Sequence, residues 1–228
     1  LTLTDATGTY TFDSVGVRLK GNSSDFHPGD KKAFKIDFNK FKVGQNYDGL
    51  KKLNFSNCFK DPTFMREKLF FDLCRAHGVP APRANYANVK YNGEDWGFYT
   101  LIEQIDDQFL DWRIGNDSGN LFKAGSNFSG GDGEANLVYL GLDQSLYEPS
   151  YELKSNEETN DWYDLIDFIY FLNSSSDTEF EAGLPSRLDL GPFLSSVAFN
   201  NLFSNLDTYT LSARNYYLYH NMSTDQWE

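Results

Sequence analysis

A helix-to-strand passage near residue 200 constrains the fold of this chain most strongly. Residues 193–203 are mostly apolar and follow the pattern of a buried helix, whereas residues 216–219 follow that of a strand. The polar connection between them contains Asp207 and Asn215. Short polar side chains of this kind are common in loops, because they hydrogen-bond to nearby backbone groups. The pattern therefore predicts one acidic and one amide side chain in or beside the same loop.

The rest of the chain predicts an α+β architecture with two lobes. Its 228 residues, 40% of them hydrophobic and 17% aromatic, are enough for one large domain or two tightly joined lobes. Strand patterns dominate the first half, where Asn92 and Gly93 form the turn of the clearest hairpin. Helical patterns dominate the second half, so we expect lobes of about residues 1–103 and 104–228. The expected strands are residues 15–20, 33–38, 50–55, 86–91 and 96–102, and the expected helices are residues 61–77, 106–112, 161–172 and 191–206.

The charge distribution disfavours nucleic acid as a partner and suits an anionic small ligand in the first lobe. A net charge of −13 opposes phosphate-rich polymers, which bind basic surfaces. The basic residues nevertheless crowd into the first quarter of the chain, although solvated strand faces remain an alternative explanation of that pattern. No uninterrupted apolar run is long enough to span a bilayer, so we expect no membrane span in this chain. The basic residues concerned are Arg18, Lys20, Lys31, Lys32, Lys35, Lys40, Lys42, Lys51 and Lys52.

The two cysteines, Cys58 and Cys74, are predicted to remain unpaired. We expect a helix that begins at Asp61 as N-cap, has Pro62 in its first turn and ends at Gly78. Cys74 would then lie about 20 Å from the start of that helix. Three residues carry Cys58 back only about 10 Å. A disulfide needs Cα atoms within about 7 Å, so this geometry disfavours the bond.

Eight short segments, spread over nearly the whole chain, carry a resemblance to a known family. Each segment alone is modest, but the ordered set is specific. The segments are residues 17–24, 31–36, 61–67, 78–83, 92–99, 103–106, 119–123 and 207–219. In this order they resemble the CotH family, the spore-coat-protein-H-like atypical protein kinases.

This resemblance implies a two-lobed atypical protein-kinase-like fold, with a strand-rich N-lobe, a helical C-lobe, and ATP with Mg²⁺ or Mn²⁺ in the cleft. The implied reaction is phosphoryl transfer to Ser or Thr of an exported or surface protein with a Ser/Thr-rich segment. The implied location is secreted or cell-surface, which in the namesake family is the spore coat. Six Asn-X-Ser patterns are compatible with secretion. A further family Asp, a metal ligand, belongs just after a strand such as residues 226–228, so we expect a chain truncated at both ends.

The family pattern makes Asp207 the catalytic acidic residue and places Asn215 near the metal ion. Phosphoryl transfer depends mostly on positioning and charge neutralisation, so ATP requires cations. Arg18, Lys32 and Lys35 can supply them. Exposed strand positions remain the alternative for both lysines.

Small residues beside these cations are further candidates for nucleotide binding. Asn22, Ser23 and Ser24 would let backbone N–H groups approach phosphate oxygens.

Four charged residues complete the expected nucleotide site. Arg66 and Glu67, on the expected first helix, are candidates for fixing a lysine or a phosphate, with a surface ion pair as the alternative. Glu103 ends an expected strand where a kinase hinge would touch adenine, with helix capping as the alternative. Lys123 is a weaker candidate for the same cleft.

A second class of function stays open. The chain is alternatively a non-catalytic binding or adhesion module on a kinase-like fold, a function that the missing downstream Asp would favour. A carbohydrate-active enzyme is a more distant possibility, because aromatic residues are plentiful but no isolated carboxylate pair stands out.

Overall fold

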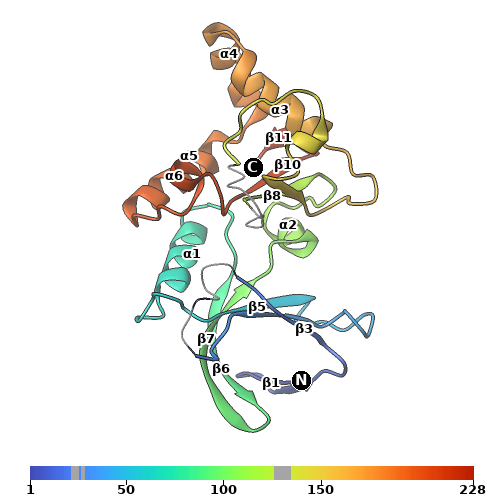
Figure 1. Ribbon diagram of the computed structural model, residues 1–228, viewed down its shortest axis with the longest axis vertical. Coiled ribbons are helices and arrows are strands. Elements are labelled where there is room, and N and C mark those ends of the chain that lie inside the picture. The colour runs from blue at the N-terminus through green and yellow to red at the C-terminus, as the bar shows by residue number, and fades with distance from the viewer. Residues whose placement is uncertain (22–25, 27–28, 126–134) are drawn as a thin grey trace. The chain divides into compact units, whose positions relative to one another are not determined.

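The computed structural model describes residues 1–21, 26, 29–125 and 135–228. The protein contains both α-helices and β-strands (Figure 1). The chain forms two compact units. The first comprises Leu1–Arg75 and Ala81–Phe109, and the second comprises Ala76–Pro80 and Leu110–Glu228.

The first unit is built on a five-stranded antiparallel sheet in the order β3-β4-β5-β7-β6. A separate two-stranded ribbon pairs β1 with β2. Asn92 and Gly93 both have positive φ, 52° and 87°, which suits the two-residue turn predicted for the β6–β7 hairpin. The strands are β1 (Thr2–Thr4), β2 (Thr9–Thr11), β3 (Gly16–Leu19), β4 (Phe34–Asp37), β5 (Lys52–Ser56), β6 (Ala84–Tyr91) and β7 (Glu94–Glu103).

The two faces of this sheet differ in chemistry. Alternate residues of β4, β5 and β7 build an apolar core, in which the rings of Phe34 and Phe55 stack with centroids 4.4 Å apart. A cavity of about 1360 Å³ opens on this face. The opposite face receives the intervening residues, which apart from Gly16 are polar or charged on β3, β4 and β5 and include the acidic Asp37. The buried core residues are Phe12, Ile36, Phe38, Leu53, Phe55 and Tyr99.

Helix α1 (Arg66–Ala76) begins five residues later than the sequence predicted. Phe64 has φ +59°, a left-handed conformation that a helix cannot contain. Asp61 is therefore not the N-cap residue that the sequence predicted. Its carboxylate nevertheless accepts from the backbone N–H of Arg66, the first residue of the helix, at 2.9 Å, and from that of Thr63 at 3.1 Å. Gly78 follows the helix with φ +77°, as expected of a residue just beyond a helix end.

Both cysteines are free and buried, which confirms the prediction that Cys58 and Cys74 are unpaired. Cys58 instead lies 3.2 Å, sulfur to oxygen, from the hydroxyl of Thr100 on β7.

The second unit combines helices with a four-stranded sheet in the order β11-β10-β8-β9. The sequence predicted most of the helices here and one strand, residues 216–219, which corresponds to β10. It did not predict the other strands of the sheet, which are two to four residues long and too short to show a period. Helix α4 was also missed, although Ser176 and Glu179 form a capping box at its start. The elements are α2 (Asp107–Arg113, which spans the boundary of the two ranges), β8 (Leu121–Ala124), η2 (Gln144–Leu146), β9 (Tyr151–Leu153), α3 (Tyr163–Ser174), α4 (Asp177–Arg187), α5 (Leu190–Leu202), α6 (Tyr209–Ser212), β10 (Tyr217–Asn221) and β11 (Gln226–Trp227).

Helix α3 supplies much of the core of the second unit. Leu165, Phe168 and Ile169 recur at helical spacing and are fully buried. Phe168 stacks on Trp227 of β11 with ring centroids 5.2 Å apart. Among the helices that the structure describes, none is both long enough and apolar enough to cross a membrane.

Candidate functional site

A row of polar side chains crosses three strands of the first unit. Arg18 on β3 lies directly opposite Lys35 on β4, and Lys35 lies directly opposite Asn54 on β5. Directly opposed residues of neighbouring strands point to the same face of a sheet. The structure therefore brings together two of the predicted cations, Arg18 and Lys35, on the polar face.

Lys20 joins this row from the end of β3. Its ammonium donates to the side-chain oxygen of Asn54 at 3.3 Å. Asn54 is buried and donates in turn to the side-chain oxygen of Gln104 at 3.2 Å. Lys20 was not among the site residues predicted from the sequence. Strand alternation was the available signal, since Lys20 follows Arg18 by two positions and so shares its face.

The carboxylate of Glu67 on α1 interacts electrostatically with Lys20 of this cluster. Burial raises the pKa of Glu67 above its usual range, while a hydrogen bond from the Ser56 side chain and the attraction of Lys20 act in the opposite direction. Ser56 follows Asn54 by two positions on β5 and therefore lies on the same face of the sheet. A lysine close to a helical glutamate resembles the pair that orients the phosphate-binding lysine in kinases.

Two other predicted nucleotide ligands of the first unit have different surroundings. Lys32 lines the cavity on the apolar side of the sheet, as do Phe34 and Ile36. The Arg66 side chain is 71% exposed and donates to the carbonyl of Lys60 at 3.2 Å.

Glu103 has a structural role that was not predicted from the sequence. Its carboxylate is buried and accepts from the backbone N–H of Arg83 at 2.8 Å and from the Arg83 guanidinium at 3.1 Å. Glu103, at the end of β7, is thus tied to Arg83, the residue before β6. Asn22, Ser23 and Ser24 lie outside the described residues.

The second unit carries the predicted acidic–amide pair in one loop. Asp207 lies after α5 and is exposed, and Asn215 lies just before β10. The Asn215 side chain donates to the backbone carbonyl of Asp207 at 3.1 Å. The Ser212 hydroxyl, at the end of α6, donates to Oδ1 of Asp207 at 3.0 Å. The structure therefore brings Asp207 and Asn215 together.

Strand β8 anchors this loop. The backbone N–H of Asn215 donates to the carbonyl of Ala124 at 3.2 Å. Next to it, a Cβ on Gly125 would lie only 2.3 Å from Cβ of Arg214, so the two backbones approach as closely as glycine permits. Lys123 lies in the same strand, opposite Tyr217 of β10 and Glu152 of β9. Lys123 is thus in the same unit as Asp207 and Asn215.

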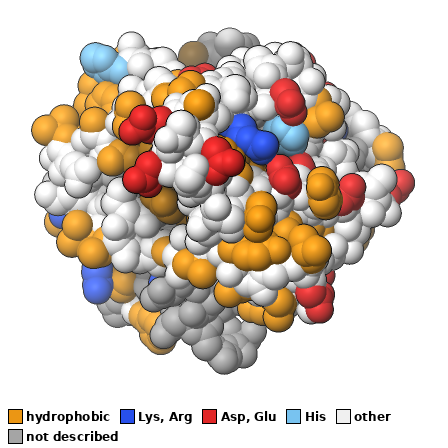
Figure 2. Space-filling model, turned by 90° about the horizontal axis from the view of Figure 1, so that it is seen from above, with side chains coloured by type: hydrophobic (Ala, Val, Ile, Leu, Met, Phe, Trp, Pro, Cys, Tyr) orange, Lys and Arg blue, Asp and Glu red, His pale blue; other side chains and the backbone are white. Residues whose placement is uncertain are grey.

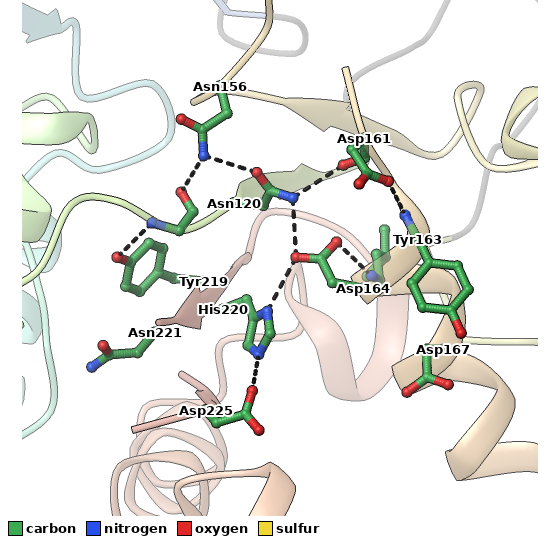
Figure 3. Close-up of polar contacts among 12 residues, drawn as sticks. Asn120, Asn156, Asp161, Tyr163, Asp164, Asp167, Tyr219, His220, Asn221 and Asp225 are labelled. Atoms are coloured by element: carbon green, nitrogen blue, oxygen red, sulfur yellow. Dashed lines mark hydrogen bonds and ion pairs between the residues drawn. The ribbon is translucent and has the colours of Figure 1, made fainter. Parts of the chain in front are cut away.

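A polar network that the sequence did not reveal supports the strands that follow the loop (Figure 3). His220 on β10 lies between two carboxylates, with Nδ1 3.2 Å from Asp164 and Nε2 3.1 Å from Asp225. Burial raises the pKa of Asp164, while hydrogen bonds from Asn120 and Leu165 and the presence of His220 act against that shift. His220 also stacks on Trp227 at 4.9 Å. The network therefore ties α3 to the β10–β11 hairpin.

The donor atoms of the loop suit a hard cation. The carboxylate of Asp207 and the amide oxygen of Asn215 are oxygen donors of the kind that Mg²⁺ binds together with waters and substrate phosphates. Within the part of the chain that the structure describes, no group of three or more His, Cys, Asp or Glu side chains is arranged to hold a metal ion.

Comparison with known proteins extends over almost all of the chain. The model of the family described as CotH kinase protein matches residues 17–228. The inner spore coat protein H of Bacillus subtilis (strain 168) is 29% identical over 202 residues, which cover 87% of this chain and 52% of that protein. The chain thus spans about half the length of this curated relative. The family match, over far more than half of the sequence, confirms the resemblance read from the eight segments: the chain belongs to the CotH family.

Proposed function

We propose that this protein transfers the γ-phosphoryl group of ATP, with Mg²⁺ or Mn²⁺, to Ser or Thr hydroxyls of a protein acceptor. The observation that carries the proposal is the loop in which Asn215 donates to Asp207 at 3.1 Å. Kinase catalytic loops use a carboxylate on the acceptor hydroxyl and an amide on the metal ion. The description of the family, CotH kinase protein, supports the same reaction.

The first unit would hold the phosphates of the nucleotide. Lys20, Lys35 and Arg18 lie on one face and supply positive charge where ATP carries several negative charges. Glu67 would keep the Lys20 ammonium in position, since the two attract each other at a site where Glu67 is largely withdrawn from water. Asn54 fixes Lys20 from the other side through its side-chain oxygen.

The loop of the second unit would act on the acceptor. Asp207 is exposed and can accept a hydrogen bond from an incoming hydroxyl, which orients the hydroxyl oxygen and receives its proton. Asn215 would hold the metal ion through its amide oxygen, because its amide nitrogen is engaged by the Asp207 carbonyl. When bound, the metal ion neutralises charge on the β- and γ-phosphates.

The charge of the second unit favours a basic acceptor. Of the 33 acidic residues in the chain, 19 lie in residues 76–80 and 110–228, against only 5 of the 20 basic ones. On the face shown in Figure 2, acidic side chains are more prominent than basic ones. Complementary charge steers partners and selects among them. We therefore propose Ser/Thr-rich acceptor segments that also carry Lys or Arg.

The relative from Bacillus subtilis supports a location for the acceptor. Its name describes an inner spore coat protein. By analogy, we propose that the protein acts on an exported or surface-layer protein.

Calorimetry with ATP tests the nucleotide half of this proposal. The complete protein should bind ATP in the presence of Mg²⁺ or Mn²⁺, and Lys35→Ala should weaken binding about tenfold, the typical effect of losing one charge-assisted contact. Lys90→Ala is the matched control, because Lys90 lies on the hairpin and pairs with Asp95. If the wild-type protein binds no nucleotide with either metal, the proposed phosphoryl transfer is wrong.

A further inference from the structure

The side-chain hydroxyl of Ser212 hydrogen-bonds to the carboxylate of Asp207, the group that would receive the acceptor hydroxyl. It lies 3.0 Å from Oδ1 of Asp207 and 3.2 Å from the carbonyl oxygen of Thr208. A serine hydroxyl has one proton, and both neighbours are acceptors, so Ser212 can donate to only one of them at a time. The ionised carboxylate is the stronger acceptor.

The backbone around Ser212 is fixed from several directions. Its N–H donates to the carbonyl of Thr208 at 3.0 Å, and its carbonyl accepts from Nε of Arg214 at 3.2 Å. Ala213 then adopts a left-handed conformation, φ 46° and ψ 46°, which ends α6 and turns the chain toward Asn215. The hydroxyl of Ser212 therefore projects from a constrained position, whereas the Asp207 side chain that it contacts is exposed.

We propose that Ser212 is a positioning residue for the phosphoryl transfer, an inference that rests on the proposed function. By holding Oδ1, Ser212 selects one rotamer of Asp207 and leaves Oδ2 to receive the acceptor hydroxyl. A carboxylate that is already oriented loses less entropy when the acceptor arrives, and reaction rates depend steeply on such orientation. Ser212 touches neither substrate nor metal and acts only through Asp207.

Steady-state kinetics on the full protein, with ATP and a Ser-containing basic peptide, test this role. Ser212→Ala should lower kcat about tenfold, in line with the loss of a hydrogen bond to a charged group, and leave KM for ATP and for the peptide unchanged. Ser212→Thr should restore most of kcat, because it keeps the hydroxyl. Ser145→Ala is the matched control, since Ser145 donates to Oδ1 of Asp143 at 2.8 Å in the same unit but at a different loop.

Each possible result of these measurements either supports or overturns the positioning role of Ser212. An unchanged kcat in Ser212→Ala overturns the positioning role and leaves the proposed function standing. A lowered kcat with a lower melting temperature, raised KM values or no rescue by Thr shows a structural role and also overturns the inference. If the wild-type protein transfers no phosphate, the proposed function and the inference fall together.

Discussion

The carboxylate of Glu67 on α1 is attracted by the ammonium of Lys20 beyond β3, and this attraction offsets part of the cost of burying Glu67. The burial is nevertheless the larger effect, so the pKa of Glu67 stays above its ordinary value of 4.5. A carboxylate whose pKa is raised on folding destabilises the fold at neutral pH. Glu67 is therefore retained at a cost in stability, as expected of a residue that serves a binding site.

This relationship predicts an opposite effect of Glu67→Gln on stability and on binding. As pH rises above 4.5, the unfolded chain loses its Glu67 proton before the folded chain does, so the free energy of unfolding falls. The Gln side chain cannot ionise, so Glu67→Gln should lack this decline. The stability of the variant relative to the wild type should therefore be higher at pH 7 than at pH 4. Its affinity for ATP should fall several-fold, because Lys20 loses its partner. Denaturant unfolding at a series of pH values, with nucleotide titration, measures both effects.

Glu94→Gln is the control for that experiment, because Glu94 is exposed at the tip of the β6–β7 hairpin. It should leave the pH dependence of stability and the ATP affinity as they are in the wild type. The Glu67 prediction fails if both Gln variants show the same pH profile.

The close approach of Gly125 to Arg214 predicts a strong effect of a single methyl group. In Gly125→Ala the new Cβ would lie 2.3 Å from Cβ of Arg214 and 2.9 Å from its Cα, so the loop that holds Asp207 and Asn215 must shift. Gly115→Ala is the matched control, because Gly115 has a similar φ of +80° but nothing within 4 Å. Both variants should lose about 1 kcal/mol to the left-handed backbone. Gly125→Ala should lose a further 1–3 kcal/mol or so from overpacking. Equal melting temperatures would show that the loop yields without cost.

The buried cysteines predict a difference in thiol reactivity between the denatured and the native protein. Both thiols should react in denaturant without reducing agent, because Cys58 and Cys74 are free. In the native protein Cys74 should react very slowly, since burial raises the pKa of its thiol to about 11 and the thiolate is the reactive form. A thiol reagent followed by absorbance measures both conditions. Fewer than two thiols in the denatured monomer would contradict the prediction.

Local signals in the sequence were enough for much of the first unit. Asn92 and Gly93 fixed the hairpin, since few other residue pairs adopt two consecutive positive φ values. The start of α1 was missed, because the left-handed turn at Phe64 has no sequence signal in a bulky aromatic residue. Of the four-stranded sheet in the second unit only β10 was predicted, because the other strands are short and acquire their burial from tertiary packing.

The candidate site likewise contains some residues that could be predicted from the sequence and others that could not. Asp207 and Asn215 were predictable, because a helix and a strand pattern enclose them within a few residues of each other. Lys20 and Glu67 were not predictable as a pair, since their proximity depends on how α1 packs on the sheet. Lys32 and Lys35 looked equivalent in the sequence, but strand alternation separates them: Lys35 shares a face with Asn54, and Lys32 lines the cavity.

The most direct measurement for the proposed function is radiolabelled phosphate transfer by the complete protein and by its Asp207→Asn variant. The acceptor is a Ser-rich basic peptide, and thermal melts and ATP titrations accompany both proteins. If Asp207 orients the acceptor and takes its proton, the variant should lose about 10²–10⁴-fold in transfer rate and keep its melting temperature and ATP affinity. Transfer by the variant at the wild-type rate would contradict a catalytic role for Asp207. A melting temperature lowered by several degrees, with transfer reduced only in proportion to the unfolded fraction, would instead make Asp207 a structural residue of its loop.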